Sequence, residues 1–181
     1  QILDIQEELK NAEYKVADVK KGERTKKAPL PFTTSTLQQE ASKALNFSTQ
    51  KTMRLAQQLY EGVEVKGQGT VGLITYLRTD STRVSDEAES MAKDFIISNY
   101  GEAYFSEEIA AKKDKKKIQD AHEAIRPTDL KRTPAFVKES LSRDQFRLYQ
   151  LIWKRFAARR MSAAKYETTS VKILANGYRF Q

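Results

Sequence analysis

The sequence contains no cysteine and a single histidine among its 181 residues. The absence of cysteine excludes disulfide bonds, zinc sites built from thiolates and thiol catalysis in this chain. No apolar stretch comes near the ~20 residues that a membrane-spanning helix requires, and the mean hydropathy is −0.67. The chain does not begin with the basic, apolar and small-residue succession of a signal peptide. We therefore expect a soluble, cytoplasmic protein without membrane contact, and we expect a monomer.

Acidic residues are scarcer than basic ones. The chain has 32 lysine and arginine residues against 24 aspartate and glutamate residues, so its formal net charge is +8 and its pI is near 9.5. This balance favours a polyanionic partner, although many basic domains bind no nucleic acid. The basic residues concentrate in two segments, 20–27 and 112–117. We interpret both as loops, which are either merely solvated or contact a DNA backbone without regard to its sequence.

One short segment, residues 72–81 (GLITYLRTDS), places a tyrosine, an arginine and an aspartate at the end of an apolar run. On an extended strand, Tyr76 and Arg78 leave by the same face as Ile74. The other face then carries Leu73, Thr75 and Leu77. Because a guanidinium fits a phosphate and favours the phenolate over the phenol, this pair suits attack on a phosphodiester. The same spacing is typical of an amphipathic surface strand, so these two residues alone leave the choice open.

Three segments occur in the order found in the bacterial type IA DNA topoisomerases: residues 31–41 (PFTTSTLQQEA), 72–81 and 121–128 (AHEAIRPT). Shorter matching segments extend the resemblance over nearly the whole chain: 51–53, 59–61, 148–153 and 164–166. The resemblance implies a transesterification in which Tyr76 attacks a phosphodiester of single-stranded DNA, forms a 5′-phosphotyrosine bond and frees a 3′-hydroxyl. It also implies strand passage, religation and relaxation of negative supercoils without ATP.

The resemblance suggests roles for the neighbours of the tyrosine. It implies that Arg78 is catalytic and contacts DNA, and that His122 lies near Tyr76 and supports DNA contact and cleavage. On chemistry alone, a lone histidine is more often structural or on the surface. Asp80 either orients Arg78, which we favour, or caps the helix that follows.

Two further residues, Thr79 and Arg126, are expected to contact DNA. Glu123 stands three positions before Arg126 and is suited to pair with it. We expect residues 121–125 to be helical, because Pro127 would then end the helix.

The sequence holds no acidic cluster typical of a metal site. Asp80, Asp86 and Glu87 are explained by caps and by the following helix, and Asp114 and Asp120 lie in or beside the lysine-rich segment. We predict that this chain binds no metal. The resemblance implies that Mg²⁺ is bound by a separate Toprim domain, which is the second expected partner beside single-stranded DNA. Without that domain, we expect the chain to cleave DNA poorly or not at all.

Hydrophobic periodicity and helix caps predict an α+β fold that is mainly helical. Helices are expected over residues 1–11, from Ser35 or Thr36 to 45, 49–61, 85–101 and 142–160, and strands over 14–19, 72–78, 166–174 and 178–180. The expected caps are Ser85 or Asp86 for the fourth helix and Ser142, in a capping box with Gln145, for the fifth. Asn176 and Gly177 predict a hairpin turn between the last two strands. Two helices followed by a glycine-rich turn and the tyrosine strand predict a winged-helix-like domain. Following the resemblance, we assign residues 31–161 to this tyrosine domain. It would be inserted into a β-rich gate-domain portion formed by residues 1–30 and 162–181.

Alternatives remain for the function and for the single tryptophan. A non-enzymatic winged-helix DNA-binding module would fit the charge and the helix pattern. A tyrosine recombinase would show more arginines and histidines around its nucleophile than this chain has. Trp153 could stack on a DNA base, but its place within a helical apolar stripe favours the core.

Overall fold

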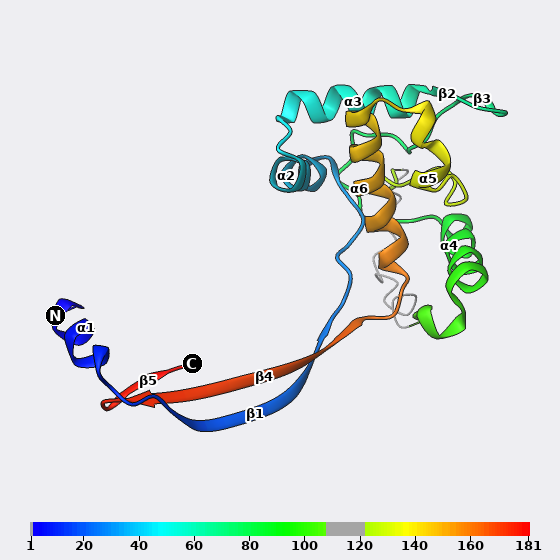
Figure 1. The fold of residues 1–181 in the computed structure, drawn as a ribbon. Helices are drawn as coiled ribbons and strands as arrows, with labels where there is room; N and C mark the ends of the chain where they lie inside the picture. Colours follow the sequence, from blue (N-terminus) through cyan, green and yellow to red (C-terminus); the bar gives the residue numbers. More distant parts are fainter. Residues whose placement is uncertain (1, 108–121) are drawn as a thin grey trace. The chain divides into compact units, whose positions relative to one another are not determined.

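The computed structural model of this chain describes residues 2–107 and 122–181. Contacts divide the chain into two compact units, one of residues 1–26 and 163–181 and the other of residues 27–162 (Figure 1). The assignment of the predicted segments 1–30, 31–161 and 162–181 to gate and tyrosine domains stays a prediction. The basic segment 112–117, together with Asp114 and Asp120, lies outside the described residues.

The first unit is a helix followed by a three-stranded antiparallel sheet in the order β1-β4-β5. Its elements are α1 (Ile2–Lys10), β1 (Lys15–Lys26), β4 (Ala164–Ala175) and β5 (Tyr178–Phe180). Strands β1 and β4 pair from Lys15 opposite Leu174 to Lys26 opposite Ala164. The loop prediction for the first basic segment is therefore wrong, because residues 20–26 belong to a strand whose backbone is paired with β4.

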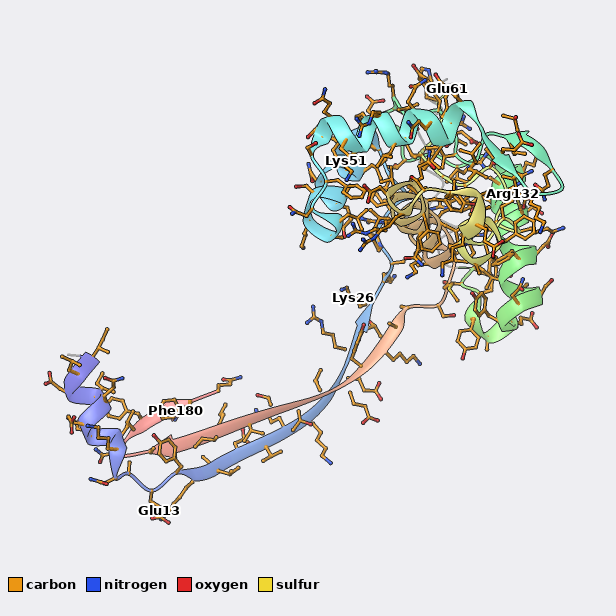
Figure 2. The ribbon with its side chains drawn as sticks, turned by 45° about the horizontal axis from the view of Figure 1, so that its top comes forward. Glu13, Lys26, Lys51, Glu61, Arg132 and Phe180 are labelled. Carbon is orange, nitrogen blue, oxygen red and sulfur yellow. The ribbon has the colours of Figure 1, made fainter. Side chains whose placement is uncertain are left out.

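The hairpin between β4 and β5 turns at Asn176 and Gly177, as the sequence predicted. Both residues have positive φ, 46° and 79°, which a tight two-residue hairpin turn requires. Most side chains of this unit project into solvent (Figure 2), and helix α1 buries none of its residues.

The second unit is mainly helical, and its described residues contain one two-stranded hairpin. Its elements are α2 (Thr34–Leu45), α3 (Thr49–Glu61), β2 (Val63–Val65), β3 (Gly69–Val71), α4 (Asp86–Tyr100), η1 (Glu102–Tyr104), α5 (Pro134–Val137), η2 (Lys138–Ser140) and α6 (Arg143–Arg159). The predicted α+β composition is confirmed. The winged-helix classification of this unit and its insertion into a gate domain stay predictions.

Helix α6 forms the centre of the second unit, where it packs against α2, α3 and α5. Its apolar stripe is buried as predicted, with Leu148, Ile152 and Phe156 fully inaccessible. Trp153 is 8% exposed, and its indole N–H donates to the Leu130 carbonyl at 3.1 Å. The tryptophan is therefore a core residue, as its helical spacing predicted.

The helix starts show how local sequence sets the boundaries. Ser142 caps α6 as predicted and forms the predicted capping box with Gln145, and of the two candidate caps of α4, Ser85 and Asp86, the structure has Ser85. Helix α2, however, is capped by Thr33, which exchanges hydrogen bonds with Thr36. The predicted start at Ser35 or Thr36 is wrong because a threonine two or three positions earlier already provides the capping hydroxyl.

Candidate active site

The segment that carries Tyr76 is an extended loop and not the strand that the sequence predicted. Within the described part of the chain, its single β-bridge joins Ile74 to Pro127. On the other side, the Leu73 amide donates to the carbonyl of Leu59 at the end of α3, at 2.8 Å. The loop is held by different neighbours at successive residues, so its backbone is fixed without a regular ladder.

Alternating burial places Tyr76 and Arg78 on the exposed side of this loop. Tyr76 is 45% exposed, whereas Leu77 and Thr79 are 1% and 8% exposed. Arg78 is exposed as well, with the buried Leu77 between the two, and this pattern agrees with the prediction that the two side chains share a face. Ile74, which was predicted to share this face, is buried, because both faces of the loop are covered by protein at that point.

Thr75 joins the tyrosine loop to the segment that contains His122. Its backbone amide donates to the Arg126 carbonyl at 2.9 Å. Its hydroxyl donates to the Ala124 carbonyl at 2.7 Å and accepts a hydrogen bond from the Arg126 amide at 3.0 Å. These bonds fix the residue directly before Tyr76, a role that the sequence did not suggest.

Thr34 fixes the loop on the other side of the tyrosine. Its hydroxyl donates to the Leu77 carbonyl at 2.7 Å and accepts from the Thr79 amide at 2.9 Å. Its own amide donates to the Thr79 carbonyl at 2.9 Å. The first residue of α2 therefore holds the turn that presents Arg78, and nothing in the spacing of the sequence indicated this contact.

A pocket of about 210 Å³ lies beside the tyrosine and is lined by Thr75, Tyr76, Thr79, His122 and Glu123. The structure thus brings the predicted nucleophile and the only histidine to the same pocket. The predicted helix over residues 121–125 is wrong for its described part, because residues 122–124 have no regular structure. Ile125 instead forms a β-bridge with Phe32, so its backbone is paired across the fold.

Glu123 and Arg126 form an ion pair next to the pocket. Glu123 Oε2 lies 2.6 Å from Arg126 Nη2, and Glu123 Oε1 accepts from the Ser85 amide at 2.7 Å. Burial opposes the charge of Glu123, but the hydrogen bonds from Ser85 and Arg126 and the positive charge of Arg126 outweigh it, so the pKa of this carboxyl lies below its usual value. The pairing of Glu123 with Arg126 was anticipated from the sequence.

Arg126 is more enclosed than a residue that only contacts DNA would need to be. Its side chain is 12% exposed, and Nη1 also donates to the Pro127 carbonyl at 3.1 Å. The guanidinium therefore stabilises the loop that ends at Pro127. Its contact with DNA stays a prediction.

The polar residues that follow Tyr76 have different environments. Asp80 is exposed, and no ion pair joins it to Arg78 among the residues that the structure describes. Asp80 does not cap the next helix, since Ser85 does so. Thr79 is largely buried and accepts a hydrogen bond from the Ser81 amide at 3.1 Å. The orienting role of Asp80 and the DNA contact of Thr79 stay predictions.

Comparison with known proteins places this geometry in a family. A family model described as DNA topoisomerase matches residues 1–181. The chain belongs to the DNA topoisomerase family. The full-length topoisomerase I of Thermotoga maritima is 43% identical in sequence and superposes with a TM-score of 0.77. The match covers 96% of this chain and 27% of that one, so this topoisomerase chain spans about a quarter of the length of its relative.

These comparisons support the resemblance to the bacterial type IA enzymes, and nothing in them supports a non-enzymatic winged-helix module. Within residues 2–107 and 122–181, no three histidine, cysteine or acidic side chains are grouped so that they could hold a metal ion. Among the same residues, no helix of this topoisomerase chain is long and apolar enough to cross a membrane.

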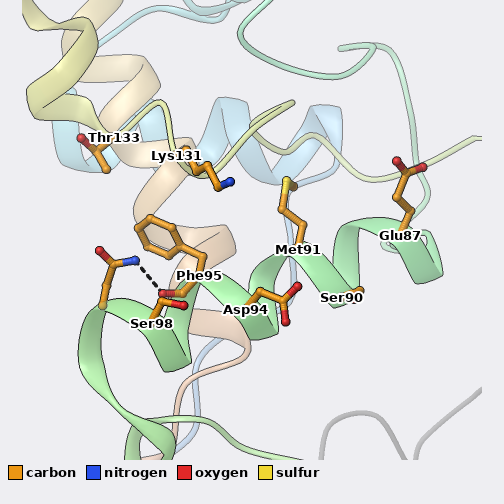
Figure 3. Close-up of a pocket in the computed structure, with 9 residues that line it drawn as sticks. Glu87, Ser90, Met91, Asp94, Phe95, Ser98, Lys131 and Thr133 are labelled. Atoms are coloured by element: carbon orange, nitrogen blue, oxygen red, sulfur yellow. Dashed lines mark hydrogen bonds between the residues drawn. The ribbon is translucent and has the colours of Figure 1, made fainter.

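A second pocket, of about 730 Å³, lies along α4 and shares no lining residue with the tyrosine pocket (Figure 3). Its walls combine the carboxylates of Glu87 and Asp94 with the Lys131 ammonium and the apolar side chains of Met91 and Phe95. This mixture favours no particular class of ligand, and we assign no function to the pocket.

Proposed function

We propose that this chain is the active-site tyrosine portion of a type IA DNA topoisomerase. Tyr76 attacks a phosphodiester of single-stranded DNA and forms a transient 5′-phosphotyrosine, which is resealed after strand passage and relaxes negative supercoils without ATP. The observation that supports this most directly is the half-exposed Tyr76 on a pocket that also contains His122. An exposed phenol beside a pocket that a phosphate could enter is what nucleophilic attack requires.

The proposed step exchanges one phosphate ester bond for another, so the free energy of the broken DNA bond is retained in the phosphotyrosine bond. The Tyr76 oxygen bonds to phosphorus as the bond from phosphorus to the 3′-oxygen breaks, the phenol loses its proton, and the 3′-oxygen gains one. Arg78 lies on the same side of the loop and neutralises the phosphate oxygens, with His122 as a supporting contact. Religation reverses the same exchange, so no nucleotide is consumed.

We also propose that the Mg²⁺ requirement is met outside this chain, by a Toprim domain. The described residues do not fit a metal site, since they provide no suitable cluster of ligands. Bound there, the ion would supply electrostatic stabilisation of the DNA phosphates. Because the chain spans 27% of its relative, we expect cleavage only when that other portion is present.

The test uses a single-stranded oligonucleotide with Mg²⁺, with and without a separately supplied polypeptide that carries the Toprim domain. Attack with the proposed polarity leaves a 3′-end label on the protein after denaturation, whereas a 5′-end label leaves with the fragment that has a free 3′-hydroxyl. Tyr76→Phe is expected to abolish the adduct. The matched control Tyr100→Phe, at another half-exposed tyrosine, is expected to retain it. An adduct that persists in Tyr76→Phe, or that carries the 5′ label, would refute the proposal.

A further inference from the structure

Tyr76 is in contact with a second tyrosine that lies outside the pocket. The ring of Tyr60, in the last turn of α3, lies 5.5 Å from the ring of Tyr76 between centroids, with 65° between the ring planes. This is the edge-to-face arrangement that aromatic pairs prefer. Tyr60 is 39% exposed, so the two rings meet at the protein surface and not in the core.

The backbones that carry the two rings are fixed against each other. A Cβ atom added at Gly72 would lie 2.7 Å from the Tyr60 carbonyl oxygen, so the tyrosine loop passes directly against the end of α3. Next to this contact, the Leu73 amide donates to the Leu59 carbonyl at 2.8 Å, and this bond fixes the loop against the end of α3. The backbones of the tyrosine loop and of the end of α3 therefore lie in fixed contact where the two rings meet.

The aromatic contact limits how the nucleophile can move. A half-exposed tyrosine with no neighbour can rotate among several rotamers, of which only some direct the phenol towards a bound phosphate. An aromatic ring against Tyr76 disfavours the rotamers that would break the pair. Holding the nucleophile near its attack geometry raises the rate of the chemical step without adding any contact to DNA.

We propose that Tyr60 is a positioning residue that holds the ring of Tyr76 for attack, through its own ring and not through its hydroxyl. The inference depends on the proposed function of Tyr76, because it concerns the rate of that reaction. Nothing in the arrangement requires Tyr60 to touch the substrate. The role differs from that of Arg78, whose guanidinium would act on the phosphate itself.

The experiment compares Tyr60→Leu and Tyr60→Phe with the unmodified chain, in each case with the supplied Toprim-containing polypeptide and saturating single-stranded oligonucleotide. Loss of an aromatic pair of this type predicts a fall in the single-turnover rate of adduct formation of about two- to tenfold for Tyr60→Leu. Tyr60→Phe is expected to restore the rate, since the ring is kept. Affinity for the oligonucleotide should stay within about twofold of the unmodified chain for both variants, because binding is not the step affected.

A second measurement reports the contact without DNA. The carbon-13 ring resonances of labelled tyrosine, with Tyr76 assigned from its loss in Tyr76→Phe, should shift in Tyr60→Leu and remain nearly in place in Tyr60→Phe. Tyr100→Leu is the matched control, because Tyr100 also ends a helix but pairs with Phe95 and Tyr104 instead. This control should change neither the Tyr76 resonance nor the rate.

Three results would overturn the inference. One is an unchanged rate in Tyr60→Leu. Another is a rate in Tyr60→Phe as low as in Tyr60→Leu, which would assign the effect to the hydroxyl. A third is weaker oligonucleotide binding with an unchanged rate at saturation, which would make Tyr60 a platform for a DNA base. Failure of the unmodified chain to form any adduct would instead refute the proposed function, and with it the reaction that Tyr60 is inferred to assist.

Discussion

Replacing Thr75 with valine tests whether the tyrosine loop is held in place by its neighbour and not by strand pairing. Valine has nearly the same shape as threonine, so the change removes the hydroxyl without opening a cavity. The Ala124 carbonyl then loses the donor at 2.7 Å and the Arg126 amide loses the acceptor at 3.0 Å. The backbone bond from the Thr75 amide to the Arg126 carbonyl remains, which limits the loss to these two groups.

The expected cost follows from the burial of those groups. Ala124 is fully inaccessible, so water cannot replace the lost donor. An unsatisfied buried backbone group costs about 1–3 kcal/mol. Because Arg126 is only partly buried, its amide should cost about 1 kcal/mol, the low end of this range. We therefore expect Thr75→Val to lower the free energy of unfolding by about 2–4 kcal/mol in total. This loss is large compared with the total free energy of unfolding of an ordinary domain, which is ~5–15 kcal/mol.

Urea unfolding followed by tryptophan fluorescence measures this difference in the second unit. Trp153 is the only tryptophan and lies in the core of that unit, so its emission reports the unfolding of the part that contains Thr75. Thr70→Val is the matched control, because the Thr70 hydroxyl donates to the exposed Glu64 carboxylate and water can replace it. We expect the control to cost less than about 1 kcal/mol. A Thr75→Val variant as stable as the control would refute the account of how the loop is held.

Three further predictions concern other contacts of the second unit. Because the pKa of Glu123 is depressed in the folded state, its interactions stabilise the protein above the unfolded value of about 4.3 and are lost as the pH falls through the lower folded value. Glu123→Gln should therefore flatten the acid limb of stability against pH, and an unchanged limb would contradict this. Gly72→Ala forces the loop away from the Tyr60 carbonyl and should cost about 1–3 kcal/mol by urea unfolding, whereas a neutral effect would show that the close approach is not rigid. Trp153→Phe leaves the Leu130 carbonyl without its donor and should cost about 1–3 kcal/mol by circular dichroism melts; an unchanged melting temperature would argue against that hydrogen bond.

Much of the helical framework could be predicted from local sequence. The cap at Ser142, the range of α3 and the Asn176–Gly177 turn depend on interactions within a few residues, and they were predicted correctly. The cap of α4 was narrowed to Ser85 or Asp86 for the same reason. The strand prediction for residues 72–78 was wrong for the opposite reason. An apolar run shows that a segment is buried, but it does not show whether a pairing partner continues alongside it.

The candidate site likewise contains residues that could be predicted from the sequence and residues that could not. Tyr76 and Arg78 could be selected from their chemistry and their alternation along the loop, and His122 from a resemblance to a family. Thr34, Thr75 and Tyr60 could not, because each acts on the tyrosine loop through a contact between separate segments. A threonine at such a position looks like any other threonine until its hydrogen-bond partners are known.

The sequence by itself determined the kind of fold, the starts of α3, α4 and α6 and the excess of basic over acidic residues, because these are local or compositional properties. The family followed from the resemblance of several whole segments to known proteins, which the comparisons then showed. Only the tertiary structure decided that the tyrosine loop is fixed by Thr75 on one side and Thr34 on the other, and that the Ser85 amide donates to the Glu123 carboxylate. The physical reason is that each of these contacts joins backbones brought together by the packing of the core. No spacing along the chain encodes such a meeting.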